Sequence, residues 1–97
     1  MTLRLRWTEQ AVSQLGAIAE YISLSSPIYA EQIVERIVLR LRQVQQFPES
    51  GRQVPEAGNA EVRELIESPY RIIYRVRQEA IEILAIVHGR QDLLANL

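Results

Sequence analysis

Two kinds of side chain alternate in YRIIYRVR, residues 70–77, and this alternation is the clearest structural signal in the chain. Successive side chains of a β-strand point to opposite faces of the sheet. Tyrosine, isoleucine and valine side chains would therefore share one face, and Arg71, Arg75 and Arg77 would share the other face with Ile73. The pattern predicts a half-buried strand whose second face carries several guanidinium groups. That face is a candidate site for an anionic partner.

The run AIEILAIVH, residues 80–88, is predicted to form a β-hairpin with residues 70–77, because only a short QEA segment separates them. With Glu79 and Ala80 as the turn, the numbers of paired residues sum to about 159. One face of this hairpin is apolar throughout and is expected to pack against helices. The pairs expected on the opposite face are Arg77 with Glu82, Arg75 with Leu84, Ile73 with Ile86 and Arg71 with His88.

An apolar centre surrounded by arginines would be a sticky surface if water reached it. A partner chain that covers Ile73, Leu84 and Ile86 is one solution. The alternative is that the C-terminal LLANL or the long loop before the sheet folds back over this face. Likewise, Arg77 and Glu82 are expected to form an ordinary cross-strand ion pair rather than a functional site.

The first half of the chain predicts a strand followed by two helices. TLRLRW, residues 2–7, alternates like a short strand at a sheet edge. Thr8 is a helix cap, and apolar residues then recur at helical spacing until the SLSSP break. Ser26 before Pro27 begins a second amphipathic helix that runs to about residue 46. FPESGRQVPEAGN, residues 47–59, is predicted to be a loop, and EVRELI after it a strand.

Composition excludes several classes of protein. The chain has 97 residues, which indicates one α+β domain spanning 1–97. It has no cysteine and a single histidine, so neither a metal site nor another cofactor is expected. A net charge of -1 does not favour a protein that coats nucleic acid by bulk charge, although all eleven cations are arginines. No stretch resembles a membrane span or signal peptide, so the cytoplasm is the expected compartment.

The order of several fragments resembles the ParE branch of the ParE/RelE superfamily of toxins from bacterial type II toxin-antitoxin systems. They are Trp7, AIAEYISLSSPIYAEQIVERI, FPESGRQVPE, VREL, YRIIYRV and ILAIVHGRQDL, which together reach from residue 7 to about residue 94. The resemblance implies a helical hairpin packed on a twisted antiparallel sheet in the order β-α-α-β-β-β. This agrees with the order that periodicity predicts.

The resemblance also implies partners. Members of the family are neutralised by a ParD-like antitoxin, whose acidic and apolar C-terminal segment wraps along the toxin, and they reach operator DNA only through that antitoxin. The residues that would meet such a segment are Arg63, Arg71, Ile73, Arg75, Leu84, Ile86 and Arg90. The helical hairpin would supply a second surface, and no membrane partner is expected.

The resemblance leaves the activity open between two branches. ParE-like members resemble poisons that bind DNA gyrase and trap it on cleaved DNA, with no hydrolytic chemistry of their own. RelE-like members cut messenger RNA in the ribosome, which needs a general base, a general acid and cations for the phosphate. Arg71, Arg75 and His88 are the residues available for that chemistry, but the chain has no lysine and its tail has no tyrosine.

We therefore expect a gyrase inhibitor that acts by binding and has no catalytic residues. The alternatives are an RNA-cleaving enzyme and an interaction module that has lost its toxicity. Arg52 in the loop is expected to hold that loop in place through hydrogen bonds to carbonyl groups. The ending HGRQDL, residues 88–93, resembles the ParE-type HGRRDL but has Gln91 in place of a second arginine, which argues against a role for paired arginines there.

Overall fold

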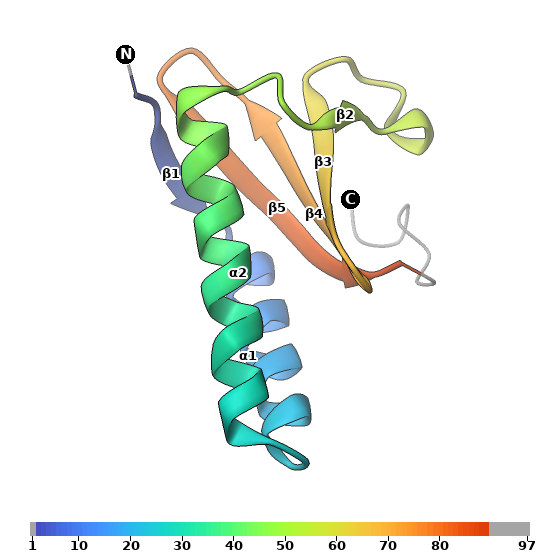
Figure 1. The fold of residues 1–97 in the computed structure, drawn as a ribbon. Helices are drawn as coiled ribbons and strands as arrows, with labels where there is room; N and C mark the ends of the chain where they lie inside the picture. The colour runs from blue at the N-terminus through green and yellow to red at the C-terminus, as the bar shows by residue number, and fades with distance from the viewer. Residues whose placement is uncertain (1, 90–97) are drawn as a thin grey trace.

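The computed structural model describes residues 2–89, in which two helices pack on one face of a five-stranded sheet (Figure 1). The elements follow the order β1 (Arg4–Trp7), α1 (Glu9–Ser23), α2 (Pro27–Gln46), β2 (Arg52–Gln53), the 3₁₀ turn η1 (Pro55–Ala57), β3 (Val62–Glu67), β4 (Tyr70–Val76) and β5 (Ala80–His88). The predicted fold class and element order are confirmed. The short β2 and η1 lie within the segment predicted to be a loop.

Both helices begin where their capping residues predict. The hydroxyl of Thr8 accepts a hydrogen bond from the amide of Ala11 at 3.1 Å, and the hydroxyl of Ser26 accepts one from the amide of Tyr29 at the same distance. Pro27 occupies the first turn of α2, where the absence of an amide hydrogen costs no helical hydrogen bond. The two antiparallel helices form a hairpin whose far end projects beyond the sheet (Figure 1).

The strands are arranged in the order β1-β5-β4-β3-β2. The neighbouring pairs among β2 to β5 are antiparallel, whereas β1 runs parallel to β5, so the sheet is mixed. We call the face that contacts the helices the inner face and the opposite one the outer face. The inner face and the helices bury one main core, made of Ala11, Ile33, Ile37, Leu41, Val44, Leu65, Ile72, Tyr74, Ile81, Ile83 and Ile86.

The predicted register of the last hairpin is wrong, because the turn lies one residue earlier and β5 contains an irregularity. The amide of Arg77 donates to the carbonyl of Ala80 at 2.9 Å, which closes the turn around residues 78–79. Tyr74 then lies opposite Ile83, whereas Ile73 lies opposite Ala85, so one extra residue is accommodated between them. A shift of one position exchanges the faces of a strand.

Ile86 therefore lies on the inner face and is 1% exposed, although the sequence predicted it on the outer face. Its place on the outer face is taken by Ala85 and Val87.

A second apolar cluster covers the centre of the outer face. It consists of Val54, Val62, Ile73, Ala85 and Val87, with Ala57 and Leu84 at its edge. Val54 and Ala57 come from the β2–η1 segment, which folds back over the sheet. The alternative in which the long loop covers this face is therefore confirmed, and Ile73 is fully buried rather than exposed. Among residues 2–89, neither helix has the length and apolar character of a membrane span.

Two glycines make contrasting predictions for stability. A Cβ at Gly51 would lie 2.6 Å from the carbonyl oxygen of Glu64 and closer still to the hydroxyl of Tyr74, whereas a Cβ at Gly16 would meet nothing within 4 Å. We expect Gly51→Ala to lower the free energy of unfolding by about 2–3 kcal/mol through steric conflict. The control Gly16→Ala should raise it by about 0.5–1 kcal/mol, because alanine favours a helix interior over glycine. Urea denaturation followed by circular dichroism measures both, and equal effects would contradict the packing described at Gly51.

Candidate functional site

The outer face is organised around a carboxylate that is fully buried. The side chain of Glu64 on β3 has no exposed surface, and Arg52 on β2 pairs directly with it across the sheet. Nε of Arg52 donates to Oε1 of Glu64 at 2.6 Å, and Nε of Arg71 donates to Oε2 at 2.8 Å. Nη2 of Arg71 donates to the same Oε2. A buried carboxylate is tolerated only when its charge is compensated in this way.

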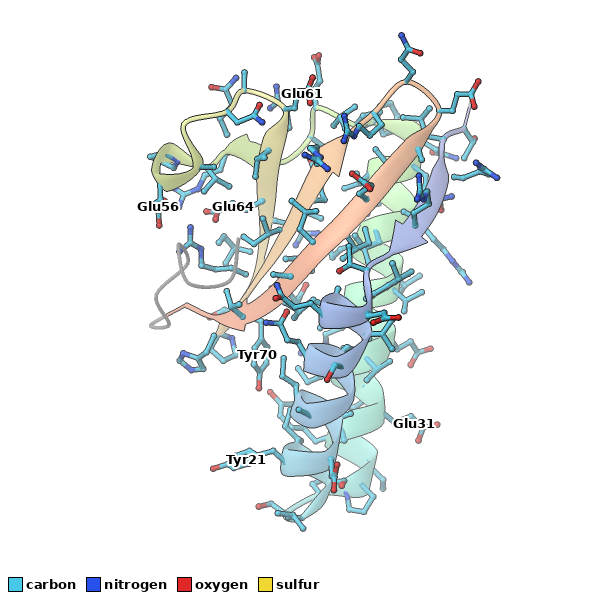
Figure 2. The ribbon with its side chains drawn as sticks, turned by 180° about the vertical axis from the view of Figure 1, so that it is seen from behind. Tyr21, Glu31, Glu56, Glu61, Glu64 and Tyr70 are labelled. Atoms are coloured by element: carbon cyan, nitrogen blue, oxygen red, sulfur yellow. The ribbon has the colours of Figure 1, made fainter. Side chains whose placement is uncertain are left out.

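Arg71 also connects this carboxylate to the η1 turn. Its Nη1 donates to Oε2 of Glu56 at 3.2 Å, and its own side chain is only 12% exposed. Burial favours a lower pKa for Arg71, but its hydrogen bonds to Glu64 and Glu56 outweigh burial and raise the pKa. The pKa of Glu56 is lowered mainly by a hydrogen bond from the backbone amide of Glu56 itself. The hydrogen bond from Arg71 is the second cause. Figure 2, which views the outer face, shows Glu56 and Glu64 close together beside β2.

We refer to Arg52, Glu56, Glu64 and Arg71 as the Glu64 cluster. It joins β2, η1, β3 and β4 through alternating charges. The expectation that Arg52 holds the loop through carbonyl groups is wrong, because its partner is the carboxylate of Glu64.

Arg63 takes the loop-holding role instead. It lies opposite Tyr74 on the inner side of the sheet, not beside Arg71 on the outer face. Its Nη1 donates to the carbonyl oxygens of Gly51 at 2.8 Å and Glu49 at 3.4 Å. The hydroxyl of Tyr74 supports the same loop, since it accepts from the amide of Gly51 and donates to the carbonyl of Pro48, each at 2.9 Å. Arg63 was predicted to contact a partner together with the arginines of the outer face, and its place on the other side of the sheet gives no support to that contact.

A second group of charges lies further along the outer face. Glu82 on β5 is opposite Arg75 on β4, and its Oε1 accepts from Nη2 of Arg75 at 2.8 Å and from Nε of Arg77 at 3.3 Å. The hydrogen bond from Arg75, followed by that from Arg77, lowers the pKa of Glu82. The predicted ion pair of Arg77 with Glu82 is confirmed, although Arg75 is its closer partner.

The residues considered for RNA cleavage do not lie together. His88 is opposite Tyr70 and contacts it edge-on, with the ring centres 6.0 Å apart. Tyr70 packs against the inner core, whereas Arg71 lies opposite Val87 on the outer face. Because paired residues share a face, the imidazole and the Arg71 guanidinium point to opposite sides of the sheet.

The remaining predicted contacts have mixed outcomes. Ile73 is on the predicted face but buried beneath Val54, and Leu84 is half-buried at the edge of that cluster. Arg75 keeps 30% of its side chain exposed. Arg90 lies outside the described residues. Within residues 2–89, no group of three or more potential metal-binding side chains occurs.

Sequence reasoning anticipated Glu82 as a partner of Arg77 but missed Glu64 and Glu56, the two glutamates that neutralise Arg52 and Arg71. Glu64 alternates with Val62 and Ile66 on one face of its strand, and an acid on an otherwise apolar face beside an arginine-rich strand was the available signal. Glu56 had no such signal, because its contact with Arg71 depends on how the η1 turn folds back. Chemically, the outer face can bind anions through its arginines, but it holds no assembled pair of general acid and general base among the described residues.

The comparisons with known proteins agree with this architecture. The family described as the ParE toxin of the type II toxin-antitoxin system parDE matches residues 5–93. The toxin candidate Y4kP of Sinorhizobium fredii is 34% identical over 92% of this chain and 91% of its own length. Toxin RelE2 of Caulobacter vibrioides is also 34% identical, over 86% of this chain and 91% of its own.

A solved structure gives the same result. A chain of the chromosomal ParDE toxin-antitoxin system from P. aeruginosa superimposes with a TM-score of 0.73 and 32% identity, over 90% of this chain and 96% of that chain. The sequence match spans nearly all of the helical hairpin and the sheet, and the structural match reproduces their arrangement. This chain therefore belongs to the ParE toxin family of type II toxin-antitoxin systems.

Proposed function

We propose that this toxin acts by binding DNA gyrase rather than by cutting RNA, and that a ParD-like antitoxin neutralises it. The observation that carries the proposal is the separation of Arg71 and His88 on opposite faces of the sheet. General acid–base cleavage needs such groups within reach of one phosphate. Binding a target imposes no such requirement.

The charge balance of the outer face supports the same proposal. Arg71 and Arg75 each hold a carboxylate of the chain itself, at Glu64 and Glu82. A catalytic guanidinium must be available for the charge that develops in the transition state. These two arginines are instead held in ion pairs that stabilise the fold.

For the antitoxin, we propose the exposed part of the outer face around Arg75 and Leu84. Arg75 is partly exposed, and its strand partner Glu82 is two residues from Leu84, which is half-buried at the edge of the outer apolar cluster. The outer face thus offers a charged group and an apolar group there. An acidic and apolar segment matches this combination. The antitoxin carboxylate would share Arg75 with Glu82 rather than meet an unpaired cation.

A gyrase assay tests the proposed activity. Stoichiometric addition of the purified toxin to DNA gyrase should inhibit supercoiling and accumulate cleaved plasmid, because a bound poison traps the enzyme on cut DNA. Antitoxin added first should prevent both effects. The proposal would be contradicted if gyrase were unaffected and primer extension mapped cuts in translated messages. That result would favour RNA cleavage. The absence of both activities would assign the chain to interaction alone.

The antitoxin surface is tested by Arg75→Ala. We expect affinity for the cognate antitoxin to fall about tenfold, as for loss of one charge-assisted contact, while the circular dichroism spectrum is unchanged. Arg4→Ala removes the same charge from the exposed surface of β1, outside both surfaces assigned to the antitoxin, and should leave affinity within about twofold. Isothermal titration calorimetry measures both. Equal affinities for the two variants would remove Arg75 from the interface.

A further inference from the structure

Four arginines occupy the corners of a rectangle on the outer face, at the end of the sheet away from the Glu64 cluster. Arg6 on β1 is level with Glu82 on β5, and Glu82 is level with Arg75 on β4. In the next row, Arg4 is level with Ala80, whose carbonyl bonds the amide of Arg77. We call Arg4, Arg6, Arg75 and Arg77 the arginine grid.

The side chains of the grid share the outer face. Leu5 and Trp7 pack against the inner core, so Arg4 and Arg6 between them point the other way. The same alternation applies on β4, where Tyr74 and Val76 face the core. Figure 2 shows β5 between β1 and β4 on this side of the molecule.

The centre of the grid is hollow. Ala80 lies between Arg4 and Arg77 in the second row of the grid, and its side chain is the smallest of the three. A surface hollow is lined there by Arg4, Arg6, Arg77, Ala80 and Glu82. The two arginines of each strand are about 6.6 Å apart, and the two strands about 9.6 Å, from standard strand dimensions.

The grid has an excess of positive charge. Four arginines and the single carboxylate of Glu82 give +3, and Glu61 and Glu79 at the rim of the hollow reduce this to +1. Oε1 of Glu82 is held by Arg75 and Arg77. Arg4 and Arg6 are exposed, and no ion pair joins either of them to a carboxylate within residues 2–89. Two guanidinium groups are thus available for a ligand.

The chemistry of the hollow favours phosphates over an acidic polypeptide. Protein interfaces gain most of their affinity from apolar and aromatic anchors in pockets. Here the apolar residues lining the hollow are Ala80 and Val76, and neither is a large anchor. Binding to a nucleic-acid backbone needs only cations at suitable spacing.

We propose that the arginine grid binds the sugar-phosphate backbone of a nucleic acid, with Arg4 and Arg6 as its principal contacts. This site is distinct from the proposed antitoxin surface except at Arg75. Binding of nucleic acid by the grid does not depend on the proposed gyrase activity, because the toxin itself would contact the phosphates in the absence of gyrase. Bidentate contacts to phosphate explain why arginine at these positions suits the role better than lysine would.

Fluorescence anisotropy of labelled nucleic acids tests the proposal directly on the purified chain. The probes are a DNA duplex of about 20 base pairs and a single-stranded RNA of the same length, at salt concentrations from about 25 to about 200 mM. The wild-type chain should bind at least one with a Kd of the order of micromolar at the lowest salt, and the tighter probe identifies the source of the phosphate. The double variant Arg4→Gln/Arg6→Gln should lose at least about tenfold in affinity, and the slope of log K against log salt should fall by about two.

A matched control separates the grid from overall charge. Arg36→Gln/Arg42→Gln removes the same two charges from the exposed surface of α2 and should change affinity by less than about twofold. Equal losses in the two double variants, or no binding by the wild-type chain at the lowest salt, would overturn the proposal. Tighter binding of a labelled glutamate-rich peptide than of either nucleic acid would also overturn it and assign the grid to acidic polypeptides. Thermal unfolding of each variant checks that the fold is retained.

Discussion

The buried carboxylate of Glu64 is the constraint on which the outer face depends. It accepts hydrogen bonds from Arg52 and Arg71, and Arg71 carries the connection on to Glu56 in the η1 turn. Removal of one partner from a buried ion pair costs about 3–5 kcal/mol, because the remaining charge is left uncompensated. The ion pairs therefore hold the turn against the sheet. That position brings Val54 over Ile73 and excludes water from the second apolar cluster.

This constraint divides the arginines of the outer face into two groups. Arg52, Arg71, Arg75 and Arg77 are neutralised by carboxylates of the same chain. Arg4 and Arg6 have no such partner among the described residues. The first group stabilises the sheet and fixes its loops, and within it Arg75 keeps enough exposed surface for the proposed antitoxin contact. The second group has no carboxylate of the chain to share. A count of arginines along the sequence does not distinguish these roles, although a functional site depends on the distinction.

The helical half of the fold was predictable because its signals are local. Thr8 and Ser26 cap their helices through bonds to residues three positions away, and the apolar periodicity of both helices needs no knowledge of the sheet. The sequence predicted that β4 and β5 form a hairpin, but it did not predict which residues of the two strands pair. Its turn lies around residues 78–79, and the extra residue accommodated near Leu84 moved Ile86 to the inner face. Moving a turn by one residue changes the pairing by two positions and keeps the faces, whereas one extra residue within a strand exchanges the faces beyond it.

The site was predictable only in part, for a related reason. The arginine face was visible in the alternation of residues 70–77, but its glutamate partners come from three other segments. Glu82 lies in the same hairpin, and its pairing with Arg77 was predicted. Glu64 and Glu56 meet Arg71 only after the sheet has formed and the η1 turn has folded back. Likewise, the overall charge of -1 concealed an uneven distribution, since the arginine grid is positive at one end of the outer face.

Amide hydrogen exchange at Val54 tests most directly whether the Glu64 cluster holds the covering segment in place. The amide of Val54 donates to the carbonyl of Val62 at 3.2 Å, and it is expected to exchange at least about 100-fold more slowly than an unstructured amide. In Glu64→Gln this protection should be lost, whereas amides of α2 such as those of Ile37 and Leu41 keep theirs, because local opening of the segment leaves the main core intact. Rapid exchange at Val54 in the wild-type protein, or unchanged protection in Glu64→Gln, would show that the Glu64 cluster does not hold this segment against the sheet.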